Sequence, residues 1–152
     1  MGICCSIDKD FSKELIEEKP QKIEKEVNYE SKPLMTEYEI EFYKKLTLAV
    51  PNNYIIQCQI PLSAIIKKVS DYRYANELYR TIDFGIINKS NFEIELLIEL
   101  NDKTHLEGKR QYRDIKVKEI CNKANIPLIA FWSNYENKVD YIAQRIKSYL
   151  KN

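Results

Sequence analysis

Apolar side chains recur along residues 33–152 with two different spacings, and each spacing predicts a type of secondary structure. Spacings of three and four residues predict helices over residues 36–50, 108–124 and 135–150. Runs rich in β-branched and aromatic residues predict strands over residues 54–60, 80–88, 92–100 and 126–132. This order, α–β–β–β–α–β–α, is typical of an α/β domain with a central mixed sheet of about four strands flanked by helices.

Local signals mark the ends of these elements. Thr36 and Glu39 have the T-x-x-E spacing of a capping box, which predicts the start of the first helix, and Pro51 ends it. The sequence Asn88-Lys-Ser-Asn91 has turn chemistry between two strand-like runs. Residues 80–100 are therefore predicted to form a β-hairpin.

Each strand of that predicted hairpin contains an acid that stands out by its position. Asp83 interrupts an apolar run, and Glu99 lies near the end of the second strand. A turn centred on Ser90 would make the two acids nearly opposite or diagonal neighbours. Carboxylates at this spacing repel each other, and a divalent cation such as Mg²⁺ between them would satisfy both. Half-exposed edge acids, or salt bridges to nearby Arg or Lys, also explain the pattern.

Three further side chains could contribute chemistry near these acids. His105, the only histidine, follows Glu99 in a polar loop, where it could orient or deprotonate a water, or simply be solvated. Arg110 and Arg113 fall on the apolar stripe of the 108–124 helix at 100° per residue. They could clamp a phosphate, because arginine suits bidentate contacts to oxyanions, or could extend past the sheet edge into solvent.

Charge is distributed unevenly along the chain. The whole sequence has 24 Lys+Arg and 23 Asp+Glu, so it lacks the bulk positive charge of a protein that coats nucleic acid. From Asp8 to Lys32, 14 of 25 residues are charged, which predicts a disordered or frayed helical tail over residues 1–32. The domain predicted over residues 33–152 has 18 basic and 15 acidic residues and is mildly basic.

The first six residues match a lipidation pattern. Met1-Gly-Ile-Cys-Cys-Ser6 fits the myristoylation motif at Gly2, with Cys4 and Cys5 available for palmitoylation. Two acyl chains would tether the protein to a membrane, whereas an ordinary start peptide explains the same residues. No apolar run is long enough to span a bilayer, and no secretory signal is present, so the expected location is the cytoplasm.

Five segments form a recognisable series along the chain: L34-M-T-E-Y-E-I-E-F-Y43, D83-F-G-I-I87, I98-E-L-N-D-K-T-H105, R113-D114 and N125-I-P-L-I129. In this order they resemble a family of small bacterial domains of unknown function, which is similar to the PD-(D/E)XK or restriction-endonuclease-like nucleases. The closer relatives of that family resemble the very short patch repair endonucleases.

The resemblance implies a nuclease-like domain that hydrolyses phosphodiester bonds of nucleic acid, DNA in the first place, with Mg²⁺ or Mn²⁺. It implies that Asp83, Glu99 and the Leu100 carbonyl hold the metal, with Glu39 completing the site in some relatives. His105 would position the water, and Arg110 and Arg113 would stabilise the transition state. Asp114 also matches a recurring family position.

One departure from the superfamily pattern affects the expected activity. Two residues after Glu99 the superfamily has lysine, and this chain has Asn101, whose amide cannot supply a positive charge. Lys103 or Lys116 could reach the site instead. A catalytically inactive module that binds nucleic acid on the same fold is therefore an alternative, and a lipid-tethered interaction protein is a third.

Overall fold

The computed structural model describes residues 28–70, 76–101 and 108–151, with residues 108–111 described by their backbone alone. The chain divides into two units, Met1–Lys32 and Pro33–Asn152, and the second carries every helix and strand described below. The sequence-based assignments to Gly2, Cys4, Cys5, Lys103 and His105 lie outside the described residues.

The observed elements follow the predicted order. They are α1 (Glu37–Ala49), β1 (Tyr54–Pro61), α2 (Leu62–Ile65), η1 (Asn76–Tyr79), β2 (Thr81–Asn88), β3 (Ile94–Asn101), α3 (Gly108–Lys123), β4 (Leu128–Trp132) and α4 (Val139–Lys147). The α–β–β–β–α–β–α prediction is confirmed, and the short helices α2 and η1 are additions to it. None of the helices in the described part of the chain has the length and apolar character to cross a membrane.

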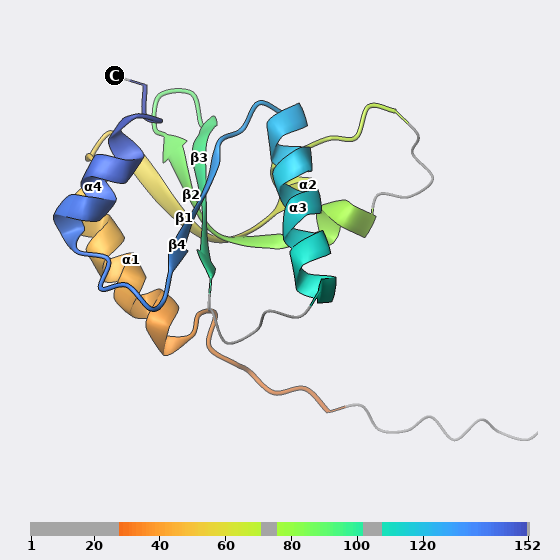
Figure 1. Cartoon of the computed structure of the whole chain (residues 1–152), viewed down its shortest axis with the longest axis horizontal. Coiled ribbons are helices and arrows are strands. Elements are labelled where there is room, and N and C mark those ends of the chain that lie inside the picture. Colours follow the sequence, from red (N-terminus) through yellow and green to blue (C-terminus); the bar gives the residue numbers. More distant parts are fainter. Residues whose placement is uncertain (1–27, 71–75, 102–107, 152) are drawn as a thin grey trace, which may run out of the picture. The chain divides into compact units, whose positions relative to one another are not determined.

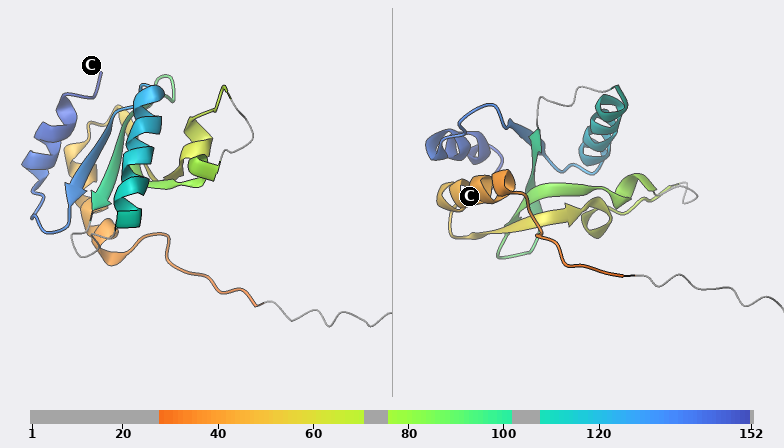
Figure 2. Two further views of the ribbon diagram at one scale, coloured as in Figure 1. Left: turned by 45° about the vertical axis from the view of Figure 1, so that its right-hand side comes forward. Right: turned by 90° about the horizontal axis from the view of Figure 1, so that it is seen from below.

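The four strands form one mixed sheet in the order β1-β2-β3-β4. The first three strands are antiparallel neighbours, and β4 lies parallel to β3 at the edge. Helices α1 and α4 lie side by side on one face of this sheet, and α3 covers the other face (Figures 1 and 2). The parallel pair places the ends of β3 and β4 together, next to the start of α1.

Each face of the sheet has its own hydrophobic core. The first core joins α1 and α4 to the sheet through Phe42, Leu46, Phe84, Ile86, Leu96, Ile98, Ile129, Phe131, Ile142 and Ile146, among others. The second core lies under α3 and contains Ile60, Leu62, Leu78, Ile82, Leu97, Val117 and Cys121. Burial of such aliphatic and aromatic side chains is the main stabilising contribution to the fold.

Helix α1 begins as its sequence predicts, but α4 begins later. The Thr36 side chain accepts the Glu39 N–H and the Glu39 carboxylate accepts the Thr36 N–H, so the capping box is confirmed. Helix α4 begins at Val139 rather than at Tyr135. Asn137 prevents the earlier start, because it has a φ of 46° and its side chain donates to the Trp132 and Tyr135 carbonyls.

The hairpin register differs slightly from the one predicted. Phe84 pairs with Ile98, and an irregularity between Ile86 and Ile87 shifts the register before the turn. The paired residues end at Phe84 and Ile98, so Asp83 and Glu99 are the next residues along their strands and are neighbours, as predicted. A bulge of this kind depends on cross-strand packing, which the turn sequence alone does not show.

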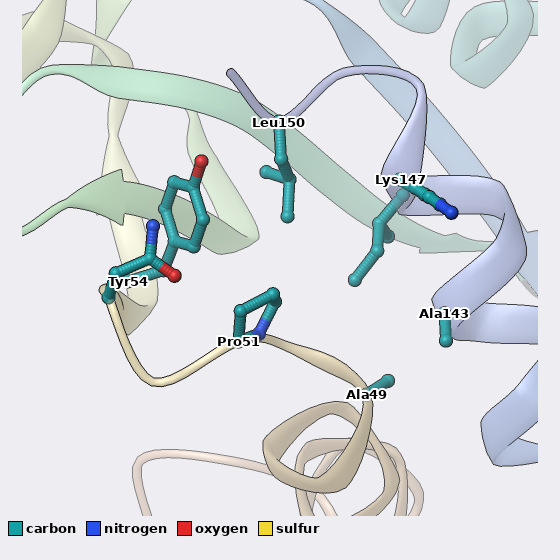
Figure 3. Close-up of a pocket in the computed structure, with 8 residues that line it drawn as sticks. Ala49, Pro51, Tyr54, Ala143, Lys147 and Leu150 are labelled. Carbon is teal, nitrogen blue, oxygen red and sulfur yellow. The ribbon is translucent and has the colours of Figure 1, made fainter. Parts of the chain in front are cut away.

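The turn end of the hairpin holds the C-terminus of the domain. Glu95 is 5% exposed and its two oxygens accept the Asn88 amide and the Lys151 N–H, each at 2.8 Å. The Tyr54 hydroxyl donates to the Lys151 carbonyl. Tyr54 also lines a pocket of about 280 Å³ between the ends of α1 and α4, and among its described lining residues only Lys147 is charged (Figure 3).

Candidate active site at the open end of the hairpin

Strands β1 and β2 change from one core to the other at the same point. Cys58 and Phe84 pair and pack with the first core, whereas the next pair, Ile60 and Ile82, belongs to the second. Regular alternation would keep residues two apart on one face of the sheet. Each strand therefore rotates about its own axis between these pairs, so that side chains two residues apart point to opposite faces of the sheet. Asp83 is the β2 residue at this point.

Asp83 is half-buried and points towards β3. Its Oδ2 accepts the Leu100 N–H at 2.7 Å, in the place where a backbone carbonyl would accept in a continuous ladder. A strand residue directs its N–H and C=O to the same side, so the Leu100 carbonyl also points towards β2. Burial raises the pKa of Asp83 to about 6; the Leu100 N–H opposes this, and the charge and a hydrogen bond of Glu39 add to it.

Glu99 is half-buried on the neighbouring strand. Burial, followed by repulsion from Asp114 and Asp83, raises the pKa of this carboxyl to about 7, against the opposing charges of Lys118 and Arg80. Glu99 lines a pocket of about 270 Å³ with Arg80 and Asp114. At Glu99, burial and the two neighbouring acids therefore outweigh the two positive charges.

Glu39 approaches the same region from the first turn of α1. Its Oε2 accepts the N–H and hydroxyl of Thr36 at 2.6 and 2.8 Å, and its Oε1 accepts the Gln59 amide at 3.2 Å. Glu39 lines a pocket of about 370 Å³ together with Leu100 and Asn101. The helix cap therefore holds a carboxylate beside Asp83.

Comparison with known proteins identifies the family of the chain. Residues 31–149 match the family described as protein of unknown function, DUF2726. The chain belongs to the DUF2726 family. This match confirms the predicted membership of a family of domains of unknown function. Searches of the curated proteins and of the solved structures each give no match.

The structure brings together some of the predicted site residues of this DUF2726 domain and separates others. Asp83 and Glu99 lie on neighbouring strands, where the charge of Asp83 acts on Glu99, and the Leu100 N–H donates to Asp83. The Glu39 carboxylate lies beside Asp83 and shares a pocket with Asn101. Within the described residues, no three His, Cys, Asp or Glu side chains converge as metal ligands.

Two predicted phosphate-binding residues lie elsewhere. Arg113 is exposed and is not among the residues that line the pocket of Glu99, whereas its neighbour Asp114 is. Lys116 pairs with Glu119 at 3.4 Å on the surface of α3. Among the residues of α3 with described side chains, 112–115 are exposed and the first buried one is Val117, which fits the alternative that Arg113 extends into solvent. The side chain of Arg110 lies outside the described residues.

Three residues of this region were missed by the sequence reasoning. Arg80 and Lys118 are the positive side chains that act on Glu99, and Gln59 holds Glu39. Arg80 stands three residues before Asp83, so its closeness to the acids was the one available signal. No sequence signal pointed to Lys118, because nothing in the sequence distinguishes it from the other exposed lysines. The sequence does not distinguish Gln59 from Gln57 two residues earlier, although Gln59 is partly buried and Gln57 is exposed.

Proposed function

We propose that this DUF2726 domain is a metal-dependent phosphodiesterase with a restriction-endonuclease-like core, and that it hydrolyses nucleic acid, in the first place DNA. The observation that carries the proposal is the Asp83–Glu99 pair. Both carboxyls have a pKa raised by burial and by neighbouring acids. Strongly perturbed acids in a pocket are typical of catalytic or metal sites.

The chemistry of these side chains fits a hard divalent cation, Mg²⁺ or Mn²⁺. Such ions bind carboxylate and carbonyl oxygens and offset repulsion between acids. Asp83, Glu99 and the Leu100 carbonyl would hold the ion, and Glu39 would add negative charge beside Asp83. When bound, the ion would polarise the scissile phosphate and lower the pKa of the attacking water.

The remaining roles in the proposal fall to positive side chains around Glu99. Asn101 cannot supply the charge that lysine supplies at this position in the superfamily. We assign that role to Arg80 and Lys118, whose charges already act on Glu99. A guanidinium in the pocket with Glu99 would stabilise the negative charge that builds on the phosphate. His105 stays in the proposal as the residue that orients the water.

Cleavage assays test the proposal directly. The full chain is incubated with plasmid, single-stranded DNA and RNA, each with Mg²⁺ or Mn²⁺. Asp83→Asn and Glu99→Gln should each reduce cleavage by about 100-fold or more, because either change removes a proposed ligand. Glu93→Gln, which alters an exposed acid of the same hairpin, should cleave normally. Absence of metal-dependent cleavage on all three substrates would exclude the nuclease proposal.

A second candidate is a nucleic-acid-binding module without catalysis, which the presence of Asn101 favours. It predicts binding that weakens with salt and survives Glu99→Gln, because the contacts are to phosphates. Arg80→Ala should reduce that binding, as should Arg110→Ala combined with Arg113→Ala. If binding to the same three substrates is unchanged by both sets of changes, this alternative fails.

A further inference from the structure

Two exposed tyrosines line a pocket where β4 leads into α4. Tyr135 is 59% exposed, and Tyr141, in the first turn of α4, is 44% exposed. Both line a largely apolar pocket of about 430 Å³ together with Glu136, Asn137 and Lys138. This volume lies within the range of sites that bind small organic groups. The two rings therefore offer walls on which a planar group can stack.

Asn137 fixes the shape of the loop that carries this pocket. Its side chain is buried, and its amide donates to the carbonyls of Trp132 and Tyr135 and to the Tyr38 hydroxyl. Its φ of 46° is left-handed, a conformation that asparagine adopts more readily than most residues. A loop that is held in this way before a ligand arrives loses little entropy on binding.

Arg145 fixes the ring of Tyr141 and brings a positive charge to it. Its Nη1 donates to the Tyr141 hydroxyl at 3.2 Å, and its guanidinium lies 5.9 Å from the centre of that ring. On the other side of the pocket, Lys138 pairs with Glu136 at 3.4 Å, and both side chains are exposed. An exposed ion pair is weak, so Lys138 can exchange Glu136 for a phosphate.

The pocket lies next to the proposed active site. Strands β3 and β4 are parallel, and Asn101 pairs with Trp132, so both strands end at the same edge of the sheet. The loop after β4 passes beside α1 (Figure 1), where Tyr38 accepts the Asn137 amide. Tyr38 also lines the pocket that contains Glu39 and Asn101. A strand of nucleic acid bound at the acids would therefore come close to the two tyrosines.

We propose that the pocket of Tyr135 and Tyr141 binds a base of single-stranded nucleic acid by stacking. The inference rests on the proposed function, because it names the form of nucleic acid that is held beside that site. Aromatic rings next to positive charges bind unpaired bases of any sequence, since every base has a flat face and the charges attract phosphates. The bases of a duplex are already stacked on each other, so an intact duplex presents no base to the pocket.

Binding of three probes by the full-length chain tests this inference. The probes are a mixed-sequence single strand of DNA, its duplex, and a strand of the same length with abasic sites in place of most bases. Fluorescence anisotropy is measured with EDTA present, so that cleavage does not interfere. The parent should bind the intact single strand about tenfold more tightly than the abasic strand.

Variants of the two tyrosines locate the effect. Tyr135→Ala and Tyr141→Ala should each weaken binding of the intact single strand about tenfold, and should leave binding of the abasic strand and the duplex unchanged. Tyr135→Phe and Tyr141→Phe keep the rings and should bind as the parent does. Tyr112→Ala removes an exposed tyrosine of α3, on the other face of the sheet, and is the matched control.

Several outcomes would overturn the stacking site. These are equal binding of the intact and abasic strands by the parent, alanine variants that bind the single strand like the parent, and a Tyr112→Ala variant that is weakened as much as they are. An equal loss on all three probes would assign the contacts to phosphates instead of bases. Phenylalanine variants that bind as weakly as the alanine variants would assign them to the hydroxyls.

The cleavage assays separate this inference from the proposed function. If the stacking site fails in these ways while the parent cleaves plasmid with Mg²⁺ or Mn²⁺, the inference is wrong and the nuclease proposal stands. If the parent binds none of the three probes and cleaves no substrate, both fail. If the parent binds the single strand through the tyrosines and cleaves nothing, the stacking site is supported and the nuclease proposal fails.

Discussion

The acids at the two ends of the β2–β3 hairpin have pKa values that are shifted in opposite directions. At the turn end, Glu95 is almost fully buried, yet its pKa lies below the ordinary range. Burial alone would raise the pKa of Glu95, but the hydrogen bonds from the Asn88 amide and the Lys151 N–H lower it by more than burial raises it. At the open end, Asp83 and Glu99 have a pKa raised to about 6 and about 7.

The hydrogen-bond partners of a buried acid indicate whether it stabilises the fold or belongs to a functional site. Each oxygen of Glu95 accepts a hydrogen bond from within the domain, so the ionised carboxylate stabilises the fold. At Asp83 and Glu99, burial and repulsion from neighbouring acids outweigh the donors and positive charges around them. Such a pair stabilises the folded state poorly at neutral pH, which is expected where an acid serves binding or catalysis.

Removal of Glu95 should have the largest effect on stability. Glu95→Ala leaves the Asn88 amide and the Lys151 N–H without their acceptor and should lower the free energy of unfolding by about 4 kcal/mol. Urea denaturation at pH 7 measures this loss. Glu93→Ala, an exposed acid of the same hairpin, should change stability by less than about 0.5 kcal/mol. Equal effects of the two changes would contradict the structural role of Glu95.

Because of the two acids at the open end of the hairpin, the free energy of unfolding should fall as pH rises. A pKa raised on folding means that the folded state binds protons more tightly, so its stabilising contribution is present at low pH and is lost on passing pH 6 and 7. Between pH 5 and pH 8 we expect a loss of about 2–3 kcal/mol from these two groups. The double variant Asp83→Asn/Glu99→Gln should remove this dependence.

Urea denaturation at four pH values between 5 and 8 tests the sign. A parent protein that becomes more stable over this interval, with the double variant unchanged, would show that folding does not raise the pKa of the two carboxyls. Added Mg²⁺ should restore stability at pH 8 in the parent and not in the double variant, because a ligand that binds only the folded state stabilises it.

A smaller effect is expected from the contact that fastens the C-terminus. Tyr54→Phe removes the hydroxyl that donates to the Lys151 carbonyl and should lower the free energy of unfolding by about 1 kcal/mol. Amide hydrogen exchange at Lys151 should become faster in this variant. Unchanged exchange there would mean that the bond between Glu95 and Lys151 holds the terminus without help.

The smallest expected effect comes from a positive charge added at the open end. Asn101→Lys should raise stability at pH 8 by about 0.5 kcal/mol and have no effect at pH 5, where the acids are protonated. Gln57→Lys adds the same charge to an exposed position of β1 and is the control. If Asn101→Lys and Gln57→Lys change the free energy of unfolding equally at pH 8, the acids at the open end do not lack a compensating positive charge.

The sequence determined the features that depend on neighbouring residues. The order of helices and strands follows from apolar spacing, and the start of α1 follows from Thr36 and Glu39. Both signals act over a few residues, so they survive in any fold that contains them. The nearness of Asp83 to Glu99 was also predictable, because a short turn joins their strands.

Tertiary structure alone decided the composition of the site. The rotation of β1 and β2 at Gln59 and Asp83 requires two cores on opposite faces of the sheet, and no run of residues encodes it. That Lys118 acts on Glu99 depends on where α3 meets the sheet, and that Arg80 does so depends on the pairing of β2 with β3. A shift of one residue in a strand directs every side chain to the other face. Long-range packing sets these shifts, and packing of the two cores therefore decided which charges surround the acids.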